Sequence, residues 1–274
     1  MGRIFYKYRA INEYTKQSIS EKVFHYSRQQ ELNDTFDGRI GSDYNASYEE
    51  ISAWTQKIGL SKETVDKIIK EAENGSLEKR MDNSFIKMNN RFLYFCLSEV
   101  WDESIMWGLY ADSSKGICLG YNTIFDKEAY ILQMELLNRS NRFYFKEKEY
   151  YVSVLLKIIY DKKQIEKYNP FRRNIDSIKD SNLHKEQKWS FEKEYRSIIF
   201  DEDDGKLVQN QIYRSNILKE VIFGEKTSKN DMLEIYDLVK SKYVRDIKFY
   251  KVYSNIANMK IQRKNIEYKD IIVF

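Results

Sequence analysis

Proline, histidine and cysteine are scarce in this sequence: its 274 residues include one proline, two histidines and two cysteines. His25 and His184 have no metal-ligand spacing with Cys96 or Cys118, so we expect no zinc site and no other bound metal. Both cysteines lie in apolar, strand-like stretches and are predicted to be buried, reduced thiols. Reduced cysteines are typical of a cytoplasmic protein.

Long apolar runs and glycine-rich loops are missing as well. The apolar stretches are far shorter than the roughly 20 residues that span a bilayer, and the first residues contain no secretion signal, so we expect no membrane association. The absence of G-x-G-x-x-G after the first predicted strand excludes the doubly wound dinucleotide-binding fold. No phosphate loop ending in Lys-Ser or Lys-Thr and no G-x-S-x-G motif is present. Arg, Glu, Ser and aromatic side chains remain to carry any chemistry.

Short β-branched and aromatic stretches predict strands spread along the chain. The expected strands are 4–11, 23–27, 92–97, 116–121, 220–224, 246–253 and 258–263. Helices are expected at 61–74, 104–110 and 229–242, and the spacing of apolar residues predicts another over 145–168. We therefore predict a single α+β domain over 1–274, with a mixed or antiparallel sheet and a helical insertion at about 43–90.

Positive charge is concentrated near the C-terminus. From Lys240 onward there are nine Lys and Arg against three Asp and Glu, a net +6, although the whole chain carries only +4. Tyr243, Phe249, Tyr250 and Tyr253 are interleaved with these basic residues, in a pattern that nucleic-acid-binding surfaces share. The simpler interpretation, which we favour, is a pair of strands at about 244–274 with a solvated lysine face.

The segment "KWSFEKEYRSIIF" (188–200) places Glu192 and Glu194 one residue apart among large aromatics. In a strand, both glutamates would point to one side. The pair is either a surface ladder with a local partner in Arg196 or the acidic part of an active site. The flanking Trp189 and Tyr195 favour a packed strand.

Four blocks carry a resemblance to a known family: "YKYR" near the start, "NDTFD" (33–37), "CLSEVWDESIMWGLYADSSKGICLGY" (96–121) and "KWSFEKEYRSI" (188–198). In order and spacing they resemble an uncharacterised bacterial family, domain of unknown function twenty-nine seventy-one, over roughly 5–225. The resemblance implies a shared fold and no known activity. Thr35 replaces a proline of the family pattern, and Leu109 and Ser114 stand where histidines are common in it.

Arg9 lies on the first predicted strand, Ser27 or Ser98 ends a middle strand, and Glu192 and Glu194 come late in the chain. This order more distantly resembles the ADP-ribosyltransferases, which implies an ADP-ribosyltransferase-like sheet and NAD as the substrate. The resemblance assigns catalysis to Glu194, Glu192 and Arg9. Glu194 would contact the nicotinamide ribose, Glu192 would orient the acceptor, and Arg9 would hold the pyrophosphate. The residues expected to bind NAD are Arg9, Tyr8, Ser27, Ser98, Trp107 and Tyr110. A carboxylate near the ribose stabilises the positive charge that develops as nicotinamide leaves.

Three functions stay open at this stage. The first is an NAD-consuming ADP-ribosyltransferase or NAD glycohydrolase, serving as a bacterial toxin or an antiviral (phage-defence) effector, with a protein or nucleic acid as the acceptor. The second is a nucleic-acid-binding protein or a metal-dependent nuclease, in which Asp34, Asp37, Glu192 and Glu194 would hold Mg²⁺. The third is a non-catalytic interaction module whose partner is encoded nearby. Purely structural roles are also open for two of these features. Arg9 could be a buried arginine paired with Asp34 or Asp37, and the segment around Trp107 could form a layer of the core.

Overall fold

The computed structural model describes residues 2–126, 128–135, 151–161, 166–172, 175–201 and 209–273. Within these residues, the main sheet has 11 strands in the order β15-β14-β13-β5-β1-β4-β11-β8-β7-β6, with β3 paired to β4. Every pairing in this sheet is antiparallel except that of β13 with β14. The sheet is therefore mixed and mostly antiparallel, and the fold class is α+β, as the sequence predicts.

The first elements follow the expected order. They are β1 (Ile4–Arg9), α1 (Glu13–Ser20), β2 (Val23–His25), β3 (Ser27–Arg28) and the short 3₁₀ helix η1 (Gln29–Glu31). The Asn12 side chain begins α1 by accepting a hydrogen bond from the Thr15 amide, because a helix start leaves its first N–H groups without partners. α1 leads the chain from β1 into β2, which pairs with β12 (Asn210–Ile212) away from the main sheet.

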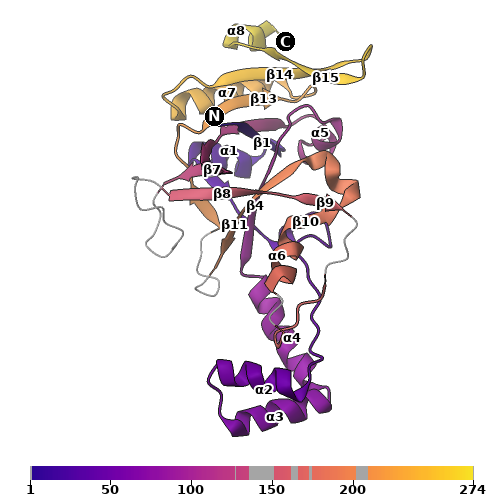
Figure 1. Cartoon of the computed structure of the whole chain (residues 1–274). Helices are drawn as coiled ribbons and strands as arrows, with labels where there is room; N and C mark the ends of the chain where they lie inside the picture. Colours follow the sequence, from indigo (N-terminus) through magenta and orange to yellow (C-terminus); the bar gives the residue numbers. More distant parts are fainter. Residues whose placement is uncertain are drawn as a thin grey trace.

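Residues 48–89 form the helices α2 (Tyr48–Lys57), α3 (Lys62–Glu73) and α4 (Ser76–Asn89). They extend from the sheet at the end opposite to the C-terminus (Figure 1). Ser61 caps α3, close to the start predicted for this helix, with its hydroxyl accepting from the Thr64 amide. Ile51, Ile68 and Leu77 are buried together in a small core of these helices, separate from the core of the sheet.

The middle of the chain supplies most of the main sheet. Its elements are β4 (Phe92–Ser98), α5 (Ser104–Tyr110), β5 (Ile117–Asn122), β6 (Ile124–Asp126), β7 (Ala129–Met134), β8 (Tyr151–Lys157), β9 (Ile159–Asp161) and α6 (Ile175–Leu183). β4 has strands β11 and β1 on its two sides and crosses the centre of the molecule (Figure 1).

The helix predicted over 145–168 is wrong wherever that segment is described. Residues 151–157 and 159–161 are strands, and β8 lies between β7 and β11. The apolar spacing alone was misleading: Leu155 is buried, Val154 and Leu156 on the opposite face are exposed, and the partners that make β8 a strand come from elsewhere in the chain. Residues 145–150 and 162–165 lie outside the described residues.

The last elements are β10 (His184–Glu186), the 3₁₀ helix η2 (Gln187–Glu192), β11 (Glu194–Phe200), β13 (Leu218–Phe223), α7 (Lys229–Lys242), β14 (Lys248–Asn255), β15 (Lys260–Asn265) and α8 (Tyr268–Val273). Ser228 begins α7 by accepting from the Asp231 amide. The two terminal strands are found where the sequence predicts them, and α8 was not expected.

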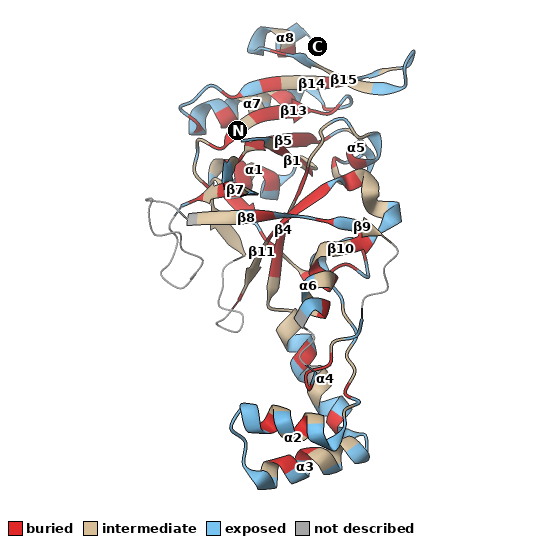
Figure 2. Ribbon diagram, in the orientation of Figure 1, coloured by how far each residue is buried: buried red, intermediate tan, exposed pale blue. Residues whose placement is uncertain are grey.

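Buried residues follow the strands through the centre of the molecule, whereas α2, α3 and α8 are largely exposed (Figure 2). The two faces of β1 enter different cores. Phe5 belongs to the large core with Phe24, Phe95 and Tyr213, and Tyr8 belongs to a smaller core with Trp107. β1 therefore separates two packed layers, and its neighbours decide where a cavity can form.

Candidate functional site

A cavity of about 300 Å³ lies beside β1 and β4. β1 pairs with β5 along its whole length but with β4 only at Tyr6 and Ser98. Because the two strands then separate, Lys7, Tyr8 and Cys96 line an opening instead of continuing the ladder. A larger cavity of about 570 Å³ shares Asp37 and Lys185 with it, but neither Glu192 nor Glu194 lines that larger cavity.

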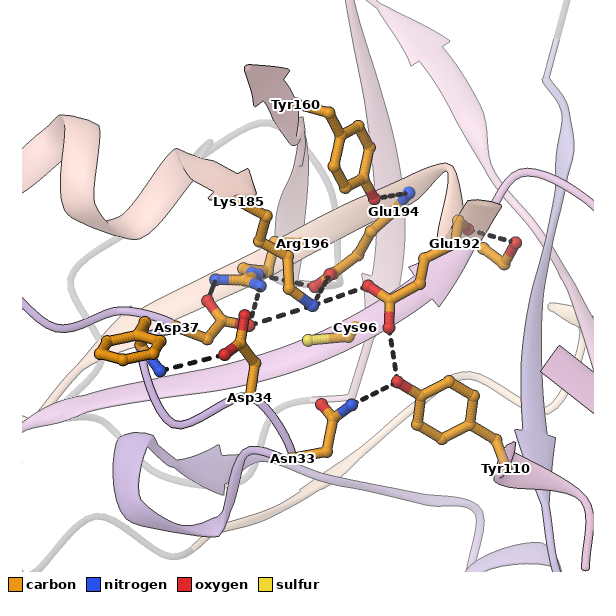
Figure 3. A network of polar contacts seen from close by, with 12 residues as sticks. Asn33, Asp34, Asp37, Cys96, Tyr110, Tyr160, Lys185, Glu192, Glu194 and Arg196 are labelled. Atoms are coloured by element: carbon orange, nitrogen blue, oxygen red, sulfur yellow. Dashed lines mark hydrogen bonds and ion pairs between the residues drawn. The ribbon is translucent and has the colours of Figure 1, made fainter. Parts of the chain in front are cut away.

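The Lys185 ammonium is the centre of a buried cluster in this cavity. Its Nζ lies 2.6 Å from Glu192 Oε2, 3.0 Å from Glu194 Oε2 and 3.1 Å from Asp37 Oδ2. Figure 3 shows the three carboxylates converging on it from different elements. Such close contacts compensate the loss of hydration that burial imposes on each charge.

Arg196 supports the cluster from the fully buried side. Its Nε donates to Glu194 Oε1 at 2.7 Å, and its two terminal nitrogens each contact an oxygen of Asp37 at 2.8 Å. A planar guanidinium in bidentate contact with a carboxylate fixes the orientation of both groups. Asp37 and Glu194 are thereby held in place by two cations each.

The two glutamates differ in their protonation. Burial opposes ionisation of Glu194, but the neighbouring Arg196 and Lys185 outweigh it and hold the pKa of Glu194 well below its usual range. For Glu192, burial and the adjacent Glu194 carboxylate raise the pKa, with Lys185 opposing them only in part. Glu194 is a fixed anion, whereas Glu192 is suited to accept or donate a proton.

Glu192 is also linked to the more open part of the cavity. The Tyr110 hydroxyl donates to Glu192 Oε1, and the Asn33 amide donates to the same hydroxyl (Figure 3). Burial and the Glu192 carboxylate raise the pKa of Tyr110, so its phenol keeps its proton. The chain Asn33–Tyr110–Glu192 therefore orients one carboxyl oxygen beside the space that a ligand would occupy.

The prediction that both glutamates lie in one strand is wrong. Glu192 ends η2 and only Glu194 begins β11, with Lys193 between them in the left-handed conformation at φ 43°. This turn bends the chain so that both side chains still reach Lys185. Residues other than glycine seldom adopt this left-handed backbone conformation, and those that do often occur at functional sites.

Four of the residues predicted to bind a ligand line the same cavity as the two glutamates: Tyr8, Ser27, Ser98 and Tyr110. Ser98 also has a structural role, because its hydroxyl donates to the Glu192 carbonyl at 2.7 Å and accepts from the Val100 amide. The Tyr8 hydroxyl donates to the Val100 carbonyl at 3.1 Å.

Two predicted site residues lie elsewhere. Trp107 has no exposed surface, contacts the Tyr8 ring edge-on, and donates from its indole to the Trp101 carbonyl, so it is a core residue. Arg9 lines a different cavity and does not reach the acidic cluster. Its alternative assignment as a partner of Asp37 is also wrong, because Asp37 pairs with Arg196 and Lys185.

Sequence reasoning missed Lys185, Asn33 and Lys7. Lys185 lies three residues before the block that carries the glutamates, and Asn33 and Asp37 belong to "NDTFD". The blocks that carry the family resemblance therefore meet at this cluster, which was the available signal. Lys7 lines the cavity, donates to the Cys96 carbonyl at 2.9 Å, and has a pKa lowered by burial.

The comparisons with known proteins add one finding. Residues 106–197 match the model of the family described as "Protein of unknown function (DUF2971)", which includes Tyr110, Lys185 and both glutamates. No curated protein and no solved structure matches the chain. The resemblance to ADP-ribosyltransferases thus stays a prediction.

Two structural features bear on the other expectations. Within the described ranges, no group of three His, Cys, Asp or Glu side chains is arranged to hold a metal ion, since Lys185 stands where the three carboxylates meet. None of the helices in the described part of the chain combines the length and apolar character that crossing a membrane requires.

Proposed function

We propose that the chain is an NAD-consuming enzyme, a glycohydrolase or ADP-ribosyltransferase, with the Glu192 cavity as its active site. The observation that carries the proposal is the charge of the cluster. Asp37, Glu192 and Glu194 supply three carboxyl groups, whereas Lys185 and Arg196 supply two cations. With Glu192 ionised, the cluster has one excess negative charge.

A cationic ring suits this cavity better than a neutral or anionic one. The nicotinamide ring of NAD is positively charged, and tyrosine faces attract cations at close range. Tyr6, Tyr8, Tyr94 and Tyr110 all line the cavity. Lys7 also lines the cavity, where its ammonium donates to the Cys96 carbonyl at 2.9 Å and burial lowers its pKa.

The size of the cavity limits what it encloses. Ligand cavities commonly measure roughly 300–1,000 Å³, so about 300 Å³ is at the small end. It suits the nicotinamide ring and its ribose, and the adenosine half of NAD would lie outside. The predicted role of Arg9 in holding the pyrophosphate is not part of this proposal, because Arg9 lines another cavity.

The reaction requires breaking the bond between C1′ of the ribose and the ring nitrogen. The bonding electrons stay with the nitrogen, so neutral nicotinamide leaves and positive charge develops at C1′. The excess negative charge of the cluster stabilises that charge. Water or an acceptor hydroxyl then forms the new bond at C1′, and Glu192, whose pKa is raised, takes the proton.

Nicotinamide release from NAD by the purified chain tests the proposal. Glu192→Gln keeps the shape but removes the base, and we expect release to fall about 100-fold or more. Tyr110→Phe loses the hydrogen bond that orients Glu192, and a loss of about tenfold is expected, the scale of one hydrogen bond to a charged group.

Glu73→Gln, at an exposed position at the end of α3, is the matched control and should release nicotinamide as the wild type does. Thermal melting verifies that each variant is folded. Assays with and without cell lysate separate transfer to a macromolecular acceptor from hydrolysis. If the wild type releases no nicotinamide under either condition, the enzyme proposal fails. Release that Glu192→Gln leaves unchanged would move the active site elsewhere.

A further inference from the structure

Arg9, at the end of β1, lines a third cavity, of about 400 Å³. Helix α1 contributes Tyr14, Gln17 and Ser18, and His25 and Asn210 come from the paired strands β2 and β12. None of the residues that line it also lines the Glu192 cavity. The two cavities are therefore separate sites.

The Arg9 guanidinium has no charge partner among the residues that the structure describes. Its side chain makes no hydrogen bond or ion pair with them, and burial lowers its pKa. The ionisable groups that act on the pKa of Arg9 are Tyr121 and Tyr213. Burial raises the pKa of Tyr121 to about 12. Both phenols are neutral at physiological pH, so no residue in the described part of the chain compensates the positive charge of Arg9.

An uncompensated charge of this kind costs stability. Arg9 is only partly exposed, and charges that lose contact with water are normally paired, because removal from water is unfavourable without a counter-charge. Arg196 illustrates the usual arrangement in this same chain, with two carboxylates in contact. Because none of the described residues supplies a counter-charge to Arg9 in this cavity, a bound anion is the source that we consider.

The rest of the cavity agrees with an anionic occupant. No Asp or Glu is among the described residues that line it. His25 Nδ1 lies 2.8 Å from Asn210 Oδ1, so that ring nitrogen donates to the amide oxygen. Tyr14 is 80% exposed at the cavity, which leaves an aromatic face for the remainder of a ligand.

We infer that this cavity binds a small organic oxyanion, with the guanidinium of Arg9 in bidentate contact with a phosphate or carboxylate group. Arg is the side chain best matched to both groups, because its planar donors pair with two oxygens at once. The cavity is larger than one such group alone, so the ligand carries a further moiety that reaches Tyr14.

Thermal melting and calorimetric titration of the full chain test this inference. The probes are inorganic phosphate, adenosine monophosphate and succinate, each compared with sodium chloride at equal ionic strength. We expect at least one oxyanion to raise the melting temperature of the wild type. Preference for the two phosphates identifies a phosphate ligand, and preference for succinate identifies a carboxylate ligand.

Arg9→Gln should weaken binding about tenfold or more and abolish the oxyanion-dependent shift. Without added oxyanion, it should melt at the same temperature as the wild type or higher, because it removes an unpaired charge. Arg9→Lys keeps the positive charge but loses the planar pair of donors, so it should bind with intermediate affinity. Arg245→Gln, at an exposed position, is the matched control and should behave as the wild type.

Two results would overturn the inference. One is a wild type whose melting temperature responds to none of the three oxyanions beyond the chloride control. The other is an Arg9→Gln variant that melts lower than the wild type and still responds to the anion. Neither result bears on nicotinamide release, because the two cavities share no residue.

Discussion

At the scale of residues, Glu192 and Glu194 show how contacts separate two chemically identical groups. Glu194 contacts both Arg196 and Lys185, whereas Glu192 shares Lys185 and otherwise accepts from a neutral phenol. The resemblance to ADP-ribosyltransferases implies that Glu194 contacts the nicotinamide ribose. The contacts favour Glu192 as the group that meets substrate, since Glu194 is engaged in holding the two cations.

Stability as a function of pH measures this difference. Removing one partner of a buried ion pair costs about 3–5 kcal/mol, so Glu194→Gln should lose that much at neutral pH. The folded-state pKa of Glu194 is lowered, so its contribution is present above about pH 4.3 and is lost as the pH falls through the folded-state pKa. The difference between wild type and Glu194→Gln should therefore shrink in acid.

Glu192→Gln should show the opposite trend. Its folded-state pKa is raised, so the wild type loses stability as the pH rises above about 4.3 and the variant does not. Denaturant unfolding between about pH 3 and pH 8 measures both trends, with Glu73→Gln as the control. Parallel profiles for the two cluster variants would contradict the assignment of fixed anion and titrating group.

At the scale of elements, the sequence predicts what local rules decide. The caps at Ser61 and Ser228, α5 and most strands follow from spacing and capping residues within a few positions. β8 was mistaken for a helix because its partners come from elsewhere in the chain. The sequence hypothesis of a metal site did group Asp37 with the two glutamates, but it could not pair Asp37 with Arg196, since the two are 159 residues apart in the sequence.

The turn at Lys193 joins η2 to β11 and decides where Glu192 points. A left-handed residue with a side chain costs roughly 1–2 kcal/mol, and glycine loses about 0.5–1 kcal/mol of chain entropy. These terms nearly cancel, so Lys193→Gly should keep stability within about 1 kcal/mol of the wild type. Proline requires φ near −65° and removes the Lys193 N–H that donates to Ser190.

Lys193→Pro should therefore destabilise the chain by more than about 1 kcal/mol and separate the two glutamates. Denaturant unfolding and nicotinamide release, measured for both variants, check this. Equal behaviour of the glycine and proline variants would show that the turn does not position Glu192.

At the scale of the whole molecule, the basic C-terminal strands form one edge of the sheet, beyond β13 (Figure 1). Several charges of these strands and of the following helix α8 already have partners. Arg263 pairs with Glu220 at 2.7 Å, Lys269 with Glu267 at 3.0 Å, and Lys251 donates to the Gly224 carbonyl. The interleaved aromatics are mostly packed too, since Tyr243 and Phe249 are buried and, of the four, only Tyr253 is exposed.

We therefore expect no measurable binding of nucleic acid at physiological salt. Phosphate contacts release counterions, and affinity for duplex DNA falls with a log–log slope of about −0.9 for each contact. Fluorescence anisotropy with a short DNA duplex and an RNA hairpin, from about 50 to 200 mM salt, gives both affinity and slope.

Submicromolar binding with a steep slope, lost in the combined variant Lys248→Glu, Lys260→Glu and Lys264→Glu, would show that this edge is a nucleic-acid surface. A binding protein or nuclease would then replace the NAD-consuming enzyme as the leading function. Weak binding that the triple variant leaves unchanged would come from elsewhere on the molecule, and the solvated lysine face would stand.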